Sequence, residues 1–124
     1  MDLVSAYILG DWILRNPDRE KVLIELGERD GYLWHQRVSI VSTLTLIRAG
    51  KFDLTFRLAE KFLTHKHDLI HKATGWMLRE IGKRGGKEEL VIFLEKYKLS
   101  MPRTMLRYSI EKFPEEERKY FMNK

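Results

Sequence analysis

The sequence contains no cysteine. It can therefore form no disulfide bond and offers no thiolate ligand for zinc. The four histidines, at positions 35, 65, 67 and 71, would need help from carboxylates to hold a metal ion. His67 and His71 are one helical turn apart, but no second carboxylate-rich motif accompanies them. We therefore expect no metal site and interpret these histidines as solvated or phosphate-facing side chains.

Long apolar runs are missing too. No stretch of about 18 uncharged apolar residues could cross a bilayer, and no charged-then-apolar leader with a small-residue cleavage site is present. These absences predict a cytoplasmic protein that does not enter a membrane. The chain has 124 residues and 44% hydrophobic content, which is enough for one core. We expect residues 1–124 to fold as a single domain.

No segment shows the alternation of apolar and polar residues that is typical of a β-strand. There are only three prolines, and Pro17, Pro102 and Pro114 each stand where a first helical turn would begin. Gly50 follows an apolar stretch, as a residue that ends a helix often does. The sequence predicts an all-α chain with helices near residues 3–15, 18–28, 32–49, 52–64, 68–84, 87–97, 102–112 and 115–122.

Two of the expected long helices are similar to each other. Residues 33–47 align with residues 69–83 at an offset of 36, which places Leu33 over Leu69, and a shorter helix follows each. Helix pairs of this length, when repeated, are typical of HEAT and armadillo proteins. We therefore predict an α-α superhelix, a solenoid of antiparallel helix pairs.

Charge is spread unevenly along the chain. The net charge is +5, but residues 1–31 carry four Lys or Arg against seven Asp or Glu. Residues 32–98 carry thirteen basic residues against seven acidic ones, and residues 99–124 carry six against four. The basic excess lies in the centre and the C-terminal part. It favours a polyanionic partner, and the alternative is an ordinary solvated basic surface.

Trp76 lies at a boundary on the helix expected at 68–84. Helical projection places it at the edge of an apolar stripe, with a basic flank just beyond. The basic residues of this flank are Lys72, Arg79 and Lys83. The tryptophan either closes the rim of the core or lines a cleft beside the flank. We interpret Gly75 as a small residue that permits close helix packing.

Arg37 departs from the pattern of its own helix. It projects into the apolar stripe of the helix expected at 32–49, one turn from Ile40 and Val41. A guanidinium group stays charged, so an anion should meet it there. The partner is either an internal carboxylate, with Glu80 as the candidate, or a nucleic-acid phosphate bound in a bidentate manner.

Three stretches together resemble the AlkD family of DNA alkylation-repair glycosylases. They are DLVSAYILGDWILRNP (2–17), LWHQRVSIVSTL (33–44) and HKATGWMLREIGK (71–83), in the family's order and at its intervals. The third is the most specific, because an aromatic-centred G-W-x-L-R-E helix that follows a W-x-x-R helix is an uncommon pairing. The resemblance implies an array of HEAT-like helix pairs whose concave, basic face holds duplex DNA.

The resemblance also implies an activity and roles for three residues. The activity is base excision repair by a DNA glycosylase, a hydrolase that removes cationic purines such as 3-methyladenine and 7-methylguanine from duplex DNA without a metal or organic cofactor. Asp2, which on local grounds is an ordinary helix cap, takes the place of the catalytic carboxylate. Arg37 takes that of an arginine on the DNA backbone near the lesion, and Trp76 that of an aromatic residue beside the lesion's deoxyribose. From their flanking position, we expect Lys72, Arg79 and Lys83 to bind DNA as well.

Members of the AlkD family continue upstream of the catalytic carboxylate, so the resemblance corresponds to their C-terminal half. The exposed face of the first helix, with Leu3, Tyr7 and Ile8, is then expected to lack a packing partner. We expect self-association through this face. Two other functions stay open from the sequence: a non-catalytic HEAT-like module that binds duplex nucleic acid, and a protein-interaction scaffold.

Overall fold

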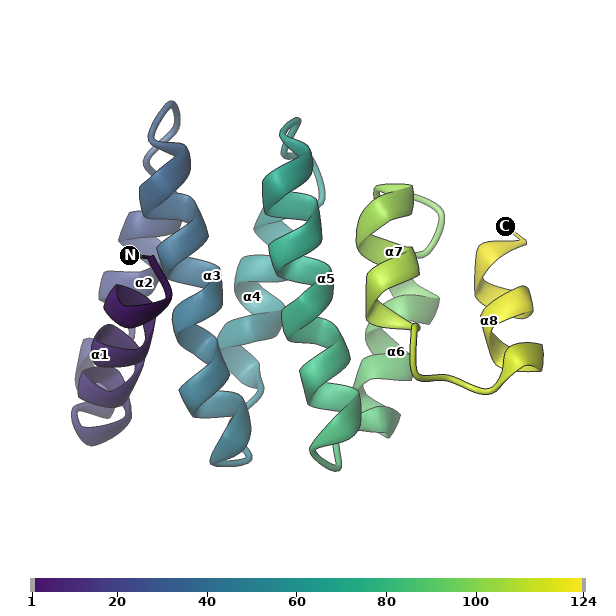
Figure 1. Ribbon diagram of the computed structural model, residues 1–124, viewed down its shortest axis with the longest axis horizontal. Helices are drawn as coiled ribbons and strands as arrows, with labels where there is room; N and C mark the ends of the chain where they lie inside the picture. Colours follow the sequence, from purple (N-terminus) through teal and green to yellow (C-terminus); the bar gives the residue numbers. More distant parts are fainter. Residues whose placement is uncertain (1, 124) are drawn as a thin grey trace.

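The computed structural model describes residues 2–123 of the chain, and the side chains from residue 4 onward. This part of the chain contains helices and turns but no strand. Figure 1 shows the helices in their order along the chain: α1 (Asp2–Arg15), a short 3-10 helix (Pro17–Arg19), α2 (Lys21–Gly27), α3 (Leu33–Arg48), α4 (Asp53–Phe62), α5 (Asp68–Lys83), α6 (Lys87–Tyr97), α7 (Arg103–Ser109) and α8 (Glu115–Met122).

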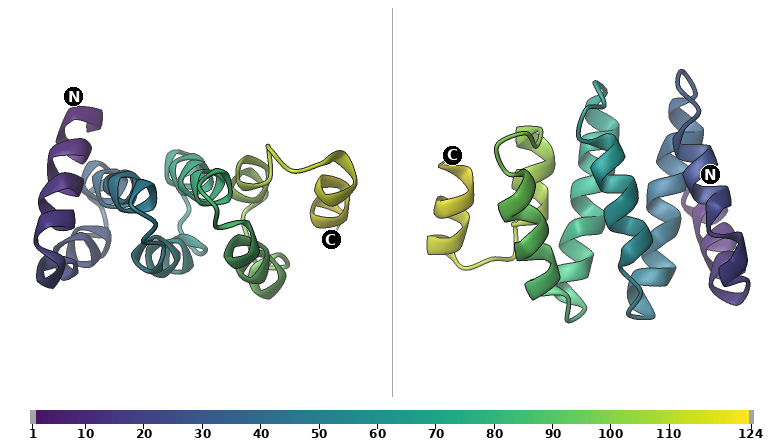
Figure 2. Two further views of the ribbon diagram at one scale, coloured as in Figure 1. Left: turned by 90° about the horizontal axis from the view of Figure 1, so that it is seen from below. Right: turned by 180° about the vertical axis from the view of Figure 1, so that it is seen from behind.

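The helices form two layers. One layer contains α1, α3, α5 and α7, each of which packs against the next. The second layer contains α2, α4 and α6, which lie behind the first and fill the spaces between its members, as the view along the helices in Figure 2 shows. Stacked antiparallel helix pairs of this kind make a helical-repeat solenoid. The all-α prediction is confirmed, and the arrangement is of the repeat type that the sequence predicts.

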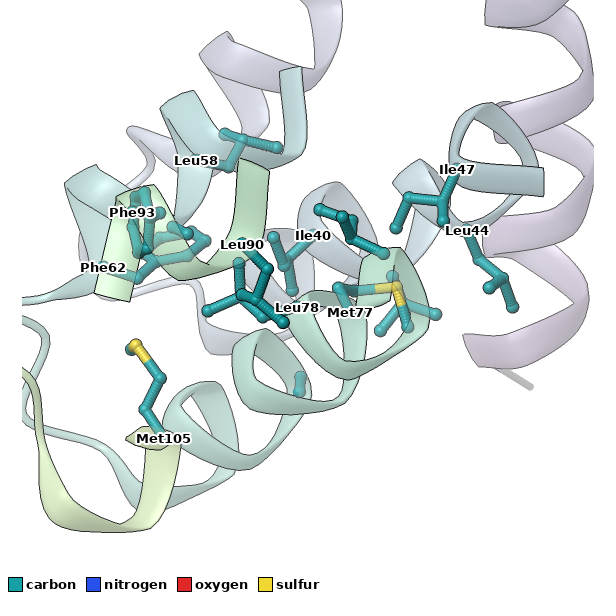
Figure 3. Close-up of a cluster of buried hydrophobic side chains, with 14 of the residues drawn as sticks. Ile40, Leu44, Ile47, Leu58, Phe62, Met77, Leu78, Leu90, Phe93 and Met105 are labelled. Carbon is teal, nitrogen blue, oxygen red and sulfur yellow. The ribbon is translucent and has the colours of Figure 1, made fainter. Parts of the chain in front are cut away.

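The hydrophobic core runs along the interface between the two layers. Figure 3 shows its central part, to which five successive helices contribute. The labelled side chains are Ile40, Leu44 and Ile47 of α3, Leu58 and Phe62 of α4, Met77 and Leu78 of α5, Leu90 and Phe93 of α6, and Met105 of α7. Burial of such large apolar side chains is the main favourable term in folding, so this continuous core holds the helix pairs together.

Two helix bounds differ by three residues from those that the sequence predicts, and the others differ by two residues or fewer. The segment expected at 18–28 begins as a 3-10 turn at Pro17, and the α-helix proper starts only at Lys21. The segment expected at 102–112 is helical to Ser109, after which the chain continues in tight turns. Phe113 is buried and precedes Pro114, and a residue before proline avoids the α conformation, so the turns after Ser109 cannot rejoin a helix at this residue.

Gly50, which the sequence marks as a helix end, adopts the expected conformation, and Gly85 adopts a similar one. Gly50 has a φ of 82° directly after α3 and its C-cap, and Gly85 has a φ of 88° between α5 and α6. Glycine occupies this left-handed region at little steric cost, which lets the chain reverse direction there.

Within the described residues, none of the helices is both long and apolar enough to span a bilayer.

Candidate nucleic-acid interface

A hollow of about 280 Å³ opens across α3, α5 and α7, and we call it the central hollow. Its lining residues are Arg37, Leu69, Lys72, Ala73, Trp76, Arg79 and Tyr108. Four of the six residues that the sequence predicts for the site therefore come together on one surface. They come from helices that lie side by side in one layer, so their relative positions are set by the packing of the array.

Helix α5 supplies most of the central hollow because of its amphipathic pattern. Its buried face includes Ile70, Met77 and Ile81, and the residues at its margin turn toward the hollow. Trp76 is half-buried: it packs against the core and also lines the hollow. Trp76 therefore both closes the rim of the core and lines a hollow beside the basic flank, which are the two positions that the sequence leaves open for it.

Gly75 brings α5 and α7 into close contact. A Cβ atom added at Gly75 would lie 2.8 Å from the carbonyl oxygen of Met105 and 2.6 Å from the Cβ of Tyr108. Backbone and a stem carbon cannot move aside as the tip of a flexible side chain can, so the position requires glycine. The helix-packing role that the sequence suggests for Gly75 agrees with this geometry, and the close approach places Tyr108 beside Trp76 in the central hollow.

Arg37 reaches the central hollow from α3 and is half-buried. The sequence names Glu80 as its alternative, internal partner. The Glu80 carboxylate is buried, and it forms ion pairs with Lys83 at 3.4 Å and with Arg84 at 3.9 Å, both from the end of its own helix. The negative charge of Glu80 is thus balanced locally, while Arg37 faces the same hollow as Trp76.

Lys83 lies outside the central hollow but borders a second one. This adjoining hollow of about 230 Å³ follows the groove between α5 and α7, and Arg79 lines both hollows. Its other lining residues are Gly82, Lys83, Lys87, Ser109, Lys112 and Phe113. The basic flank that the sequence predicts on α5 is therefore extended by lysines that the sequence analysis does not single out.

Two cations of the central hollow, Lys72 and Arg79, have exposed carboxylates as their ion-pair partners. Lys72 pairs with Asp68 at 3.4 Å on the same helix, and Arg79 pairs with Glu111 of α7. Asp68 and Glu111 are solvent-exposed, and ion pairs at exposed positions contribute only about 0–1 kcal/mol. The Nε of Arg79 is buried and has no hydrogen-bond partner within the described part of the molecule. A phosphate can therefore compete for these groups at little cost in internal ion pairing.

The backbone of Asp2 begins α1, but its side chain lies outside the described residues. Helix α1 packs along α3, the helix that carries Arg37. Gly10 permits this contact, because a Cβ there would lie 2.4 Å from the carbonyl oxygen of Ser42. The predicted role of Asp2 stays a prediction.

Three of the histidines, His65, His67 and His71, form a connected network of hydrogen bonds. His65 Nε2 lies 2.7 Å from Gln36 Oε1, and His65 Nδ1 accepts a hydrogen bond of 3.0 Å from the backbone N–H of His67. His67 is exposed, but its Nδ1 caps α5 by accepting from the N–H of Leu69 at 3.2 Å. His71 is mostly buried and bonds to the carbonyl of His65, so the prediction that it is solvated or phosphate-facing is wrong.

No group of three or more metal-binding side chains occurs within residues 2–123. Burial lowers the pKa of His65, and the positive charges of His71 and His67 lower it further.

A sequence model of the DNA alkylation repair enzyme family matches residues 1–113. The chain belongs to this family. The match spans α1 to α7 and ends before α8. Membership in the DNA alkylation repair family assigns the chain to DNA repair and makes DNA its partner. Comparison with curated proteins gave no match, and neither did comparison with solved structures.

In this DNA alkylation repair protein, sequence reasoning misses Tyr108, Lys87 and Lys112. Tyr108 enters the central hollow only because α7 lies against Gly75, a contact between distant parts of the chain. A helical projection of residues 102–112 places Tyr108 near Lys112, at the edge of that helix's buried face. This position indicates a residue at a boundary, but it does not indicate that the residue enters the central hollow.

Proposed function

We propose that this chain is a DNA glycosylase that hydrolyses the N-glycosidic bond of cationic alkylated purines, such as 3-methyladenine and 7-methylguanine, in duplex DNA. One observation carries the proposal: Arg37 and Trp76 line a single hollow together with Lys72 and Arg79. Membership in the DNA alkylation repair family supports a repair role for this surface. We further propose that residues 1–124 act as one domain.

The chemistry needs little from the protein at the leaving base. An N-alkylated purine already carries a positive charge, so it departs as a neutral base without being protonated. The difficult step is the formation of an oxocarbenium-like deoxyribose as the glycosidic bond breaks, and groups that stabilise this cation accelerate the reaction. Water then adds to the sugar carbon and loses a proton, which leaves an abasic site.

The residues divide this work. The Asp2 carboxylate stabilises the sugar cation and orients the attacking water. Trp76 offers an aromatic face, which packs on the sugar and attracts positive charge. Arg37 binds the backbone phosphate near the lesion, with Lys72 and Arg79 on neighbouring phosphates and Lys83 farther along the groove. No step calls for a metal or an organic cofactor.

The decisive experiment measures release of methylated purine from alkylated duplex DNA by this chain and by Asp2→Asn. We expect the wild type to release base and Asp2→Asn to lose on the order of 10²-fold or more in rate while binding DNA normally. Asp11→Asn is the matched control, because Asp11 lies on the same helix and pairs with Arg15 at 3.1 Å. Equal activity of Asp2→Asn and Asp11→Asn would refute the role of Asp2.

A second candidate function is a non-catalytic module that binds duplex nucleic acid. It is favoured by the lining of the central hollow, in which the described side chains are basic, aromatic or apolar and include no carboxylate. The same assay separates the two functions. If the wild type binds DNA but releases no base, the non-catalytic module is supported. If the wild type neither binds DNA nor releases base, the protein-interaction scaffold is the remaining function.

A further inference from the structure

A third hollow lies between α7 and α8, and we call it the terminal hollow. It has a volume of about 520 Å³. Its lining residues are Arg103, Arg107, Tyr108, Ile110, Glu111, Glu115, Arg118, Lys119 and Met122. One wall, α8, lies beyond residue 113, where the match to the DNA alkylation repair family ends. Family membership therefore gives no role to this hollow.

The terminal hollow has a surplus of positive charge. Four basic side chains face two acidic ones, and both acids are already engaged: Glu111 pairs with Arg79, and Glu115 pairs with Lys119 at 3.4 Å. Within the described part of the chain, Arg103, Arg107 and Arg118 have no ion-pair partner. Three guanidinium groups around one hollow are a binding site for an anion that accepts bidentate hydrogen bonds.

The terminal hollow continues the central one. Tyr108 of α7 lines both hollows, so they adjoin each other at this residue. The ion pair between Arg79 and Glu111 also joins them, because Arg79 borders the central hollow and Glu111 the terminal one. Figure 1 shows α5, α7 and α8 following one another along the array. A polyanion bound in the central hollow that continues past Tyr108 meets the arginines next.

Helix α8 is fixed in place rather than loosely attached. Phe121 is buried in the core, and the hydroxyl of Tyr120 donates to Glu95 of α6 at 3.0 Å. The same hydroxyl accepts a hydrogen bond of 2.8 Å from Lys98. Hydrogen bonds from Lys98 and Tyr120 lower the pKa of the Glu95 carboxyl, so this anchor stays ionised at neutral pH. The wall that carries Arg118 and Lys119 therefore has a defined position.

We propose that the terminal hollow is a second backbone-binding site for the same nucleic acid, holding phosphates beyond the segment that the central hollow contacts. The proposal rests on the DNA binding of the proposed function and extends it to a hollow whose second wall, α8, lies outside the family match. Continuity with the central hollow favours a nucleic-acid backbone over an acidic peptide. Such contacts carry no sequence information, so the site adds affinity and register rather than lesion specificity.

The test compares two double variants of the full chain. Arg107→Gln with Arg118→Gln removes two cations of the terminal hollow. Arg57→Gln with Lys96→Gln is the control, because these exposed residues line a cavity between α4 and α6 in the other layer and the change in net charge is the same. The control pair also resembles the test pair in its local contacts, because the Lys96 ammonium lies over the ring of Tyr97 much as the Arg107 guanidinium lies over the ring of Tyr108.

Binding to an undamaged duplex is measured by fluorescence anisotropy over a range of salt concentrations. The slope of log Kobs against log salt is expected to fall in magnitude by about 2 for the terminal-hollow pair, since each lost phosphate contact reduces it by about 0.9. The control pair is expected to keep the wild-type slope. Thermal unfolding of both variants confirms that they are folded.

The outcomes separate this inference from the proposed function. If the wild type binds the duplex and both double variants keep its slope, the terminal hollow is not a nucleic-acid site, while the proposed function stands. An equal fall in both variants shows a general effect of charge and also overturns the inference. If the wild type binds no duplex at any salt concentration, the proposed function fails as well.

Discussion

The backbone of α5 at Gly75 lies so close to α7 that a Cβ there would stand 2.6 Å from the Cβ of Tyr108. This contact sets the width of the groove that both hollows of α5 and α7 share. It also makes Gly75 the most sensitive position of the interface. Gly75→Ala is expected to lower the free energy of unfolding by about 1–3 kcal/mol, because the backbone of α7 must shift to admit the methyl group. Urea denaturation measures this change.

Gly82→Ala is the matched control for this prediction. A Cβ at Gly82 would meet the end of the Leu90 side chain at 3.1 Å, and such a flexible atom can move aside. Since alanine is favoured over glycine in a helix interior by about 1 kcal/mol, Gly82→Ala should be neutral or stabilising. Equal destabilisation by both substitutions would show that the contact with Tyr108 is not the cause.

Arg37→Ala is expected to weaken duplex binding. Arg37 faces the central hollow, and the Glu80 carboxylate already pairs with Lys83 and Arg84. Removing one phosphate contact should reduce the magnitude of the salt slope by about 0.9. Anisotropy titrations and thermal unfolding test this together. A variant that loses stability but binds DNA as the wild type does would favour the internal role for Arg37.

Trp76→Phe separates the packing role of this residue from its role at the sugar. Phenylalanine keeps an aromatic ring against the core, so the loss of stability should stay below about 1.5 kcal/mol. The smaller ring has a weaker attraction for a cation, so base release should slow at saturating DNA while the affinity for undamaged duplex changes little. Single-turnover kinetics give the rate. An unchanged rate in a folded variant would leave Trp76 with only a packing role.

Stability is expected to fall on acidification because of His65. The Nδ1 atom of His65 accepts a hydrogen bond from the backbone N–H of His67, and it cannot do so when it is protonated. Burial lowers the pKa of His65 most, and the charges of His71, His67 and Lys61 lower it too, while the charge of Asp30 raises it. Because the pKa of His65 in the folded protein lies below its ordinary value of 6.5, the unfolded state binds the proton more readily. The contribution of neutral His65 is complete above pH 6.5 and is lost as the pH falls through the folded pKa.

Urea midpoints measured between pH 8 and pH 5 test this prediction. His65→Gln should flatten the dependence in the acidic part of that window, whereas His35→Gln is the control outside the network, since His35 stacks on Tyr32. If His65→Gln and the wild type lose stability in parallel, another group controls the acid limb.

Self-association through α1 is the remaining prediction. The side chains of Val4, Ile8 and Trp12 share one face of this end helix and are 58%, 66% and 43% exposed, and Tyr7 is also exposed, while the side chain of Leu3 lies outside the described residues. Sedimentation velocity should show a mass that rises with protein concentration and a monomer for Ile8→Lys. Ile92→Lys, which changes an equally exposed isoleucine on α6, should associate as the wild type does. A wild type that stays monomeric contradicts the prediction.

The helices could be predicted because each is specified by neighbours in sequence: apolar spacing fixes the buried face, and residues such as Pro17 and Gly50 mark the ends. Arg37 and Trp76 could be singled out because each departs from the pattern of its own helix. Tyr108 could not, because it reaches the central hollow through a contact between α5 and α7 that no single helix encodes. The hydrogen bond of His71 could not be predicted either, since it depends on the course of the loop at His65.

The main contacts of the array join helices that are adjacent in the stack, so no long-range tie fixes its total extent. A protein built this way can be extended in increments of one helix pair. A further helix such as α8 then lengthens the surface of the array while the contacts between the preceding helices stay as they are.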